Sequence, residues 1–199
     1  MHLRQPAESQ DRLLNELLGA LATCVTIDVY RYAHCNIPMS TWFKADRDAA
    51  SVRFPPPLLC LICIGCGWLM SVVFGPLPLS LNDTLRLLLG GLGMVVGAGI
   101  AIVSLGQFWL TEQDPHPWKH TPSMISNGIY AWTRNPMYLA MAIFQAGLGI
   151  ALAQVWTVLF VPVFMITVQR MAITPEESYL AEKFAEDYTK YNKQVRRWL

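Results

Sequence analysis

The chain has 199 residues, of which 53% are hydrophobic and 15% are charged, and its formal net charge is +1. This length suits one domain with a sizeable core, and the charge content is low for a soluble protein. A net charge so close to zero gives no indication of a nucleic-acid partner, since nucleic-acid-binding domains are usually strongly basic. The mean hydropathy is positive, at +0.32, and the apolar residues are concentrated in three blocks after Phe54.

Residues 1–53 form a distinct N-terminal extension. Within it, the stretch LLNELLGALATCVTIDVY (13–30) predicts an amphipathic helix on the membrane surface, interrupted by Glu16 and Asp28. A further full span in this region is the alternative. No secretory signal is expected, because the first apolar stretch starts late and lacks a small-residue cleavage site. The proline-rich sequence FPPPLL, which begins at Phe54, marks the start of a membrane domain over 54–199.

Apolar stretches predict four membrane-spanning helices, at roughly 57–75, 86–109, 136–153 and 155–171. The last two come from one stretch, 135–169, that contains no charged residue. As a single helix this stretch would be about 50 Å long, against a hydrocarbon core of about 30 Å. It must therefore fold back, and the weakly helical segment 147–156 is the expected turn. The expected fold class is all-α, a polytopic membrane bundle of four spans, or five if the N-terminal extension contributes one.

Lysines and arginines are distributed unevenly along the chain. Most of them precede the first span, lie in the loop between the second and third spans, or follow the last span. The two tight connections, 75–83 and 153–156, contain none. By the positive-inside rule, both termini and the central loop are predicted to be cytoplasmic.

Cys60, Cys63 and Cys66 follow one another at three-residue spacing within an apolar helix. Because no second CxxC and no polar ligand lies nearby, this pattern favours close helix packing over a metal or redox site. His116 and His120, in HPWKH, have the spacing of a zinc pair but lack a third ligand and the usual intervening glutamate. We therefore expect no bound metal, and a loop or substrate-facing role for these histidines.

The glycine-rich segment GGLGMVVGAG (90–99) has some likeness to a dinucleotide-binding fingerprint. It does not follow a strand, however, and it lies inside the second predicted span. Small residues allow membrane helices to approach closely. We therefore expect this segment to pack against another helix.

A polar segment, GIYAWTRNPMY (128–138), opens the third span. Asn135 and Pro136 have the pattern of an N-cap followed by the first helical residue, where the missing N–H of proline does no harm. Arg134 has no such explanation, because a cation at a helix N-terminus opposes the helix macrodipole. Its presence predicts a carboxylate or phosphate nearby.

A second polar segment, TPEESYLAEKFAEDYTKYNKQVRRWL (174–199), follows the last span. Its first four residues fit a capping box in which Glu177 caps its own helix. Apolar positions then recur at helical spacing, at Leu180, Phe184, Tyr188, Tyr191 and Val195. This periodicity predicts a C-terminal amphipathic helix with its apolar stripe facing the membrane or the core. The capping box leaves Glu176 unexplained.

A membrane hairpin returns to the face from which it starts, so the two polar segments are expected at the same cytoplasmic end of the bundle. The side chains expected to converge there are Arg134, Tyr138, Arg170, Glu176 and Glu177. One interpretation is an ion-pair network that only fixes the hairpin. The other is a site for a small, charged, water-soluble cosubstrate beside a lipid-facing cavity, since ionisable residues at membrane depth are functional candidates.

The segment from about Phe54 to Leu199 resembles the isoprenylcysteine carboxyl methyltransferase and phospholipid methyltransferase family of integral membrane enzymes. The resemblance lies in NGIYAWTRNPMYLA (127–140), a hairpin, and then PEESYLAEKFAEDYTKYNKQVRRWL (175–199). The family pattern is a glycine and a tyrosine, then Arg-His/Asn-Pro-x-Tyr, and after the hairpin Glu-Glu, a phenylalanine and two spaced tyrosines. Two positions depart from it: Asn135 stands where many members have histidine, and Ala185 replaces the common glycine.

The resemblance implies S-adenosylmethionine as methyl donor, bound at the cytoplasmic end. Carried over by position, the residues that would bind it are Gly128, Tyr130, Arg134, Asn135, Pro136, Tyr138, Glu176 and Glu177, with His120 and its preceding loop covering the site. Among these, Arg134 and Glu176 are the expected catalytic residues. The implied acceptor is a lipidic, prenylated or otherwise hydrophobic molecule that enters from the bilayer, with O-methylation of an isoprenylcysteine-type carboxylate favoured.

The planar fork of Arg134 suits the carboxylate of the donor, and Glu176 or Glu177 suits its amino group, its ribose hydroxyls or its sulfonium. A carboxylate acceptor needs no general base, whereas an amine must lose a proton, which Glu176 could accept. Two other classes stay open. An NADPH-dependent reductase of the sterol reductase type has a related Arg-His-Pro-x-Tyr element, although LAMA follows Tyr138 where a carboxylate is common in reductases. In a non-enzymatic membrane scaffold, the polar residues would only cap and pin helices.

Overall fold

The computed structural model describes residues 54–113 and 122–199. Its elements in chain order are α3 (Pro56–Phe74), α4 (Asp83–Leu110), the 3-10 turn η1 (Gly128–Ala131), α5 (Pro136–Ala151), α6 (Val155–Val168), the π-helical turn η2 (Gln169–Ile173) and α7 (Thr174–Gln194). The described ranges contain helices and no strands, which confirms the all-α fold class. The helix predicted within 1–53, and both His116 and His120, lie outside the described residues.

The helices agree with the predicted spans. α3, α4 and the continuous helix Val155–Gln194 are long and apolar enough to cross a membrane, and α5 is a shorter apolar helix. The last hairpin turns between α5 and α6, where Ala153 has a φ of 54°. The turn therefore falls inside the expected segment 147–156.

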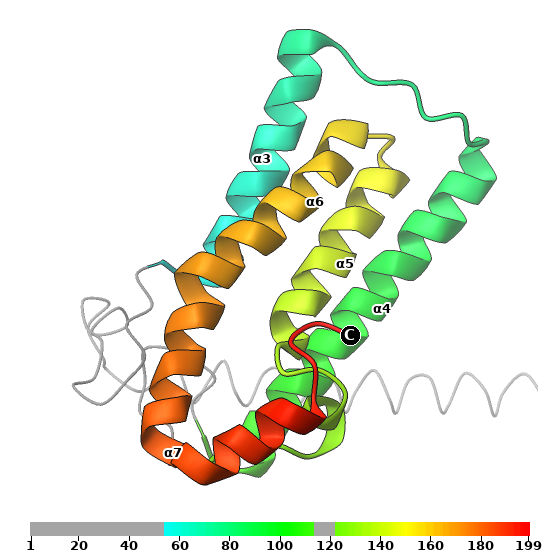
Figure 1. Ribbon diagram of the computed structural model, residues 1–199. Coiled ribbons are helices and arrows are strands. Elements are labelled where there is room, and N and C mark those ends of the chain that lie inside the picture. The colour runs from blue at the N-terminus through cyan, green and yellow to red at the C-terminus, as the bar shows by residue number, and fades with distance from the viewer. Residues whose placement is uncertain (1–53, 114–121) are drawn as a thin grey trace, which may run out of the picture. The chain divides into compact units, whose positions relative to one another are not determined.

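The four apolar helices lie side by side in the order α3, α6, α5, α4 (Figure 1). α4 packs mainly on α5, α3 packs mainly on α6, and α5 contacts α6. The α3–α4 connection and the α5–α6 turn lie at the same end, where the indole nitrogen of Trp156 donates a hydrogen bond to the carbonyl of Gly75 at 3.0 Å. η1, the start of α5 and α7 lie at the opposite end (Figure 1).

Glycines bring the backbones of α4 and α5 into direct contact. A Cβ atom at Gly90 would lie 2.4 Å from the nitrogen of Ala151, and one at Gly147 would lie 2.7 Å from the carbonyl oxygen of Gly90. A Cβ at Gly97 would lie 2.8 Å from the carbonyl oxygen of Ala140. No side chain fits at these three glycine positions, so the prediction that segment 90–99 packs against another helix is confirmed.

The interior between α3, α5 and α6 is mostly apolar, with the polar side chains of Gln145 and Thr157 buried in it. Cys60 and Cys63 are buried in this core, in keeping with a packing role. Gln145 is fully buried, and its amide donates to the carbonyl of Thr157 at 3.2 Å. Its side-chain oxygen accepts a weak bond from the thiol of Cys60 at 3.7 Å. The amide is therefore satisfied and links three helices inside an apolar bundle.

The predicted capping box at Thr174 is not formed, and the helix continues from α6 through η2 into α7. The Thr174 hydroxyl donates to the carbonyl of Gln169 at 2.8 Å, and no side chain caps the start of α7. Proline lacks an N–H and crowds the carbonyl of the residue four positions earlier. The wider π-helical turn just before Pro175 accommodates it without ending the helix.

Candidate functional site

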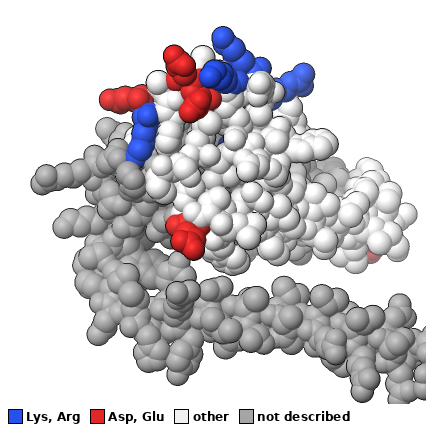
Figure 2. Space-filling view, turned by 90° about the horizontal axis from the view of Figure 1, so that it is seen from below, with Lys and Arg blue, Asp and Glu red and all other residues white. Residues whose placement is uncertain are grey.

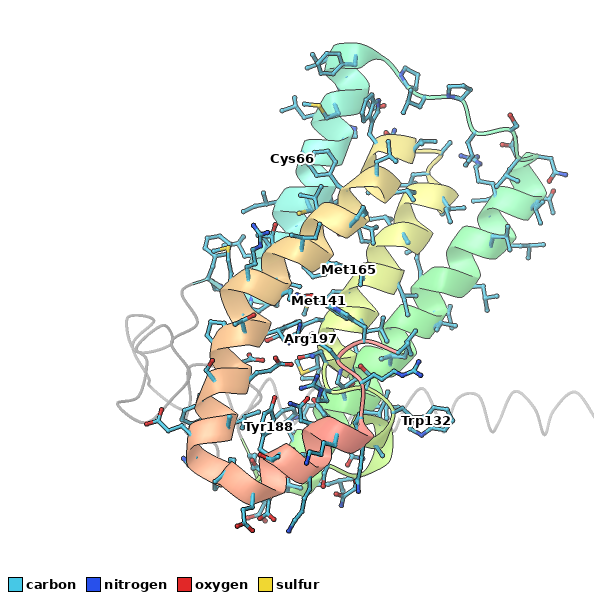
Figure 3. The ribbon with its side chains drawn as sticks, viewed as in Figure 1. Cys66, Trp132, Met141, Met165, Tyr188 and Arg197 are labelled. Atoms are coloured by element: carbon cyan, nitrogen blue, oxygen red, sulfur yellow. The ribbon has the colours of Figure 1, made fainter. Side chains whose placement is uncertain are left out.

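The two polar segments meet at one end of the bundle, as the hairpin predicted. The start of α5, the first turn of α7 and the segment 195–199, hereafter the tail, come together there, with Arg197 and Tyr188 facing the start of α5 (Figure 3). Seen from this end, acidic and basic side chains gather on one part of the surface (Figure 2). The exposed charged residues of α7 and the tail are Glu182, Glu186, Asp187, Lys190, Lys193 and Arg196.

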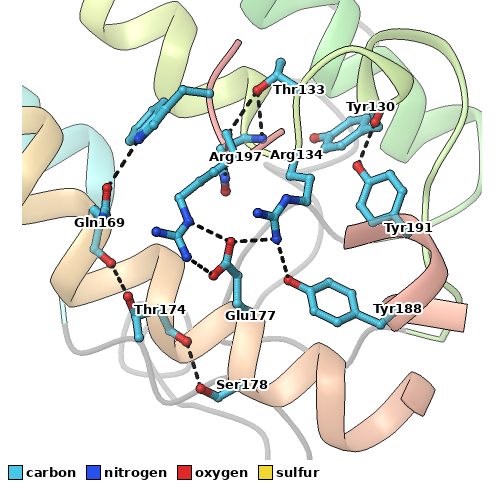
Figure 4. Close-up of polar contacts among 12 residues, drawn as sticks. Tyr130, Thr133, Arg134, Gln169, Thr174, Glu177, Ser178, Tyr188, Tyr191 and Arg197 are labelled. Atoms are coloured by element: carbon cyan, nitrogen blue, oxygen red, sulfur yellow. Dashed lines mark hydrogen bonds and ion pairs between the residues drawn. The ribbon is translucent and has the colours of Figure 1, made fainter. Parts of the chain in front are cut away.

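Two arginines share one carboxylate at the centre of the site (Figure 4). Nη1 of Arg134 lies 3.0 Å from Oε1 of Glu177. Arg197 donates to both oxygens of the same carboxylate, from Nε at 3.0 Å and from Nη2 at 2.6 Å. The side chains of Arg134 and Glu177 are only 11% and 18% exposed. The prediction that a carboxylate or phosphate lies near Arg134 is thus confirmed, and the carboxylate is that of Glu177.

Arg134 has further hydrogen-bonding capacity. Its Nη1 also donates to the hydroxyl of Tyr188 at 3.2 Å. Its Nε is buried and has no hydrogen-bond partner among the described residues. Because a buried polar nitrogen without a partner is unfavourable, this atom is a natural point of contact for an acceptor oxygen of a ligand.

Glu176 makes a separate contact with the start of the hairpin. The buried hydroxyl of Tyr138, in the first turn of α5, donates to Oε1 of Glu176 at 2.6 Å. Glu176 forms no ion pair with any residue in the described ranges. The two neighbouring glutamates therefore differ: Glu177 pairs with arginines, and Glu176 pairs with a phenol.

Asn135 and Pro136 occupy the predicted N-cap and first helical positions of α5. The Asn135 side chain, however, does not cap the helix. Its amide donates to the carbonyl of Arg197 at 3.0 Å, and the Thr133 hydroxyl donates to the same carbonyl at 3.2 Å. The explanation of Asn135 as a capping side chain is therefore wrong: capping would use the side-chain oxygen as an acceptor, whereas the contact that this side chain makes is the donation from its nitrogen to the tail.

Gly128 and Tyr130 position the segment before α5. Gly128 has a φ of 59°, and a Cβ there would lie 2.9 Å from the side-chain nitrogen of Gln107. The carbonyl of Tyr130 accepts a hydrogen bond from the hydroxyl of Tyr191 at 2.6 Å, and its ring stacks edge to face on Phe108. Burial raises the pKa of the Tyr130 phenol, so this hydroxyl stays protonated at neutral pH.

Of the other two expected members of the site, one is described and is not brought into it. Arg170 lies exposed in η2 and makes no hydrogen bond or ion pair with the described part of the chain. His120 belongs to the range 114–121, outside the described residues.

The roles of the tail and of two tyrosine hydroxyls were not predicted from the sequence. From the sequence, Arg197 served only as one of the positive charges that predict a cytoplasmic C-terminus. In the structure its side chain bonds to Glu177, and these bonds raise the pKa of Arg197 further above its usual value. Tyr188 and Tyr191 were assigned to an apolar stripe, and both are buried, but their hydroxyls bond to Arg134 and to the Tyr130 carbonyl. The available signal was chemical: phenols in a stripe carry polar ends that need partners when buried.

Comparison with known proteins places this arrangement in a class. Residues 85–187, more than half of the chain, match the model of a family described as phospholipid methyltransferase. The chain therefore belongs to the phospholipid methyltransferase family, and with its long apolar helices it is an integral membrane protein of a methyltransferase family. The match includes every described candidate residue from Gly128 to Glu177 and ends before the tail.

A bacterial relative matches part of the chain but has no described function. A protein of Haemophilus influenzae (strain ATCC 51907 / DSM 11121 / KW20 / Rd), described as uncharacterized, is 33% identical over 63 residues, which are 32% of this chain and 100% of that protein. No solved structure matches the chain.

Proposed function

We propose that this protein transfers a methyl group from S-adenosylmethionine to a hydrophobic or lipid-linked acceptor at the cytoplasmic face of a membrane. The observation that carries the proposal is the cluster of Arg134, Glu177 and Arg197, with Glu176 beside it, at the polar end of a membrane bundle. Membership of a methyltransferase family supports the reaction type. Lysines and arginines are concentrated in the central loop and after the last span, the two segments that lie at this end of the bundle. By the positive-inside rule this supports the cytoplasmic orientation.

The residues present fit the charges of the donor. Arg134 would bind the donor's carboxylate, because its buried Nε has no partner in the described ranges and its guanidinium can donate in a planar fork. Glu176 would face the positively charged part of the donor, since its carboxyl group has a phenol and no cation beside it. Gly128, Tyr130, Asn135 and Pro136 would line the same site, as the family resemblance implies. His120 and its loop would cover it.

The donor supplies a methyl group already activated on a positively charged sulfur. What remains for the protein is to bind, align and exclude water, because an in-line displacement gains most from positioning and charge placement. Tyr138 holds Glu176 in one orientation through the 2.6 Å hydrogen bond. Arg134 and Glu176 therefore act by fixing the donor, and the acceptor reaches it from the bilayer side.

Among acceptors, we favour an isoprenylcysteine-type carboxylate. Its methylation needs no group that removes a proton, and Oε1 of Glu176 already accepts the Tyr138 hydroxyl. An amine headgroup would instead require Glu176 to accept a proton. The two products differ chemically, since a methyl ester releases methanol in base and an N-methyl group does not.

Donor binding is the first test. S-adenosylmethionine titrated into detergent-solubilised protein should bind, and Arg134→Ala and Glu176→Gln should each weaken binding by about tenfold or more, the loss expected for one charge-assisted contact. Glu182→Gln, an exposed change on the same helix, is the matched control. Undiminished binding in both site variants of a folded protein would remove the site assignment. Binding of NADPH alone would place the chain with the reductases.

The acceptor is tested next with a donor labelled on its methyl group. Membrane vesicles containing the protein receive either a farnesylated cysteine or phosphatidylethanolamine, and the labelled lipid is extracted and treated with base. Label released as methanol from the farnesylated cysteine supports the carboxylate acceptor. Base-stable label on phosphatidylethanolamine would replace it with an amine acceptor.

A further inference from the structure

The tail is fastened across the start of α5 by main-chain and side-chain hydrogen bonds. The backbone N–H of Arg134 donates to the carbonyl of Arg196 at 3.0 Å, and the bonds from Thr133 and Asn135 hold the next carbonyl. The indole of Trp198 donates to the side chain of Gln169 in η2 at 3.3 Å. The tail thus spans from α5 to η2, and the Arg197 side chain points at α7 between these anchors (Figure 4).

The position of Arg197 decides the charge of the cluster. Both oxygens of Glu177 are engaged by Arg197, and one of them also by Arg134. Within the group of Arg134, Arg197 and Glu177, two guanidinium groups and one carboxylate leave a single positive charge; Glu176, which bonds to Tyr138 and to neither arginine, lies outside this group. Without Arg197, Arg134 and Glu177 would form a neutral pair. Arg197 therefore gives this group of side chains a net positive charge that a bound anion can neutralise.

We propose that Arg197 is a specificity-determining residue that gives this site its preference for a donor bearing a carboxylate. Glu177, with both oxygens used, serves as the counterion that holds the two arginines in place. In this proposal the donor's amino group falls to Glu176, one of the two glutamates expected for it. This inference rests on the proposed function, because it assumes that the donor binds beside Arg134.

The test compares two donors that differ only in the carboxylate: S-adenosylmethionine and its decarboxylated analogue. Their dissociation constants are measured in detergent for the wild type and for Arg197→Gln, Arg197→Lys, Lys193→Gln and the double variant Glu177→Gln/Arg197→Gln. Lys193 is an exposed cation in the last turn of α7 and serves as the matched control for loss of one positive charge. Size-exclusion profiles and unfolding temperatures show which variants are folded.

We expect the wild type to bind S-adenosylmethionine at least about tenfold more tightly than the decarboxylated analogue, the effect of one charge-assisted contact. Arg197→Gln should abolish this preference, while Arg197→Lys and Lys193→Gln should keep it. The double variant is the decisive case. It leaves Arg134 as the only charge of the cluster, so the preference should return although Arg197 is still missing.

The outcomes separate the two proposals. No binding of either donor by the folded wild type would overturn the proposed function itself. A wild-type preference that persists in Arg197→Gln would overturn the role of Arg197 and leave the proposed function intact. Loss of preference in both Arg197→Gln and the double variant would show that Arg197 acts only through folding of the tail. If Arg197→Gln does not fold, Glu177→Gln is compared with the double variant, which differs from it only at Arg197. The preference should be larger in Glu177→Gln, and equal preferences would overturn the role of Arg197.

Discussion

The contact of α4 with α5 is made by glycines and backbone atoms, whereas the contact of α5 with α7 is made by polar and charged side chains. Along α4 and α5, glycines such as Gly97 and Gly147 let one backbone touch the other, and no ionisable group takes part. At the polar end, Arg134, Tyr138 and two glutamates make the contact through long side chains. In lipid, helices gain little from burying apolar surface against each other, so close packing must hold the first contact.

The difference teaches which part of the molecule can change without loss of the fold. The glycine contact fixes the distance between two helices and tolerates no added atom. The polar contact fixes charges and orientations, and single groups in it can be removed while the helices stay in place. Substitutions along α4 should therefore act on folding, and substitutions around Arg134 should act on binding.

The largest effect is expected from Gly97→Leu. Its Cβ alone would lie 2.8 Å from the Ala140 carbonyl, so α4 and α5 must separate, at a cost of about 3 kcal/mol or more. Gly99→Leu is the matched control, because a Cβ at Gly99 meets nothing within 4 Å. Unfolding temperature and size-exclusion profile in detergent provide the measurement. Equal stability of the two variants would contradict the account of this helix contact.

An intermediate effect is expected from Tyr138→Phe. It removes only the hydroxyl bond to Glu176, so the free energy of unfolding should fall by about 1–2 kcal/mol and the protein should stay folded. Donor binding should weaken as well, because Glu176 loses the group that orients it. Thr189→Val, which removes an exposed hydroxyl bonded to the Ala185 carbonyl on the same helix, should leave donor binding unchanged. Unchanged donor affinity in Tyr138→Phe would argue against Glu176 as part of the site.

The smallest effect is expected from Ala185→Gly. Ala185 has a φ of 35° at the kink of α7, a positive φ that costs glycine less than alanine because glycine has no Cβ. The substitution should raise the free energy of unfolding by about 0.5–1 kcal/mol, whereas Ala181→Gly, in a regular part of the same helix, should lower it by about 1 kcal/mol. Chemical or thermal unfolding of the two variants checks the opposite signs. A loss of stability in both would mean that the kink carries no strain.

The sequence predicted the apolar helices well, because the length of an uncharged stretch and the thickness of a bilayer leave few solutions. The split between α5 and α6 follows from that argument alone. The prediction of a capping box at Thr174 was wrong. There a π-helical turn, which depends on how Pro175 fits the preceding carbonyls, continues the helix. Local pattern cannot decide between two ways of accommodating a proline.

The site was predicted in outline and missed in its pairing. Convergence of Arg134, Tyr138 and the two glutamates followed from the hairpin. Which glutamate meets the arginine did not, since neighbouring helical residues point about 100° apart and the rotation of α7 is set by distant packing. Arg197 was beyond reach for a similar reason: the tail has no periodic pattern, and its path is fixed by hydrogen bonds to Thr133 and Asn135.

The order of the helices in space has a consequence for synthesis. α3 packs mainly on α6, with Gly67 against Thr157. In the chain, and therefore in synthesis, α3 is the first of the four apolar helices and α6 is the last. A nascent chain grows from its N-terminus, so α3 must wait in the bilayer while α4 and α5 are completed. A helix that waits alone in lipid must be stable there without help. The complete absence of charged residues from Pro56–Phe74 meets that requirement.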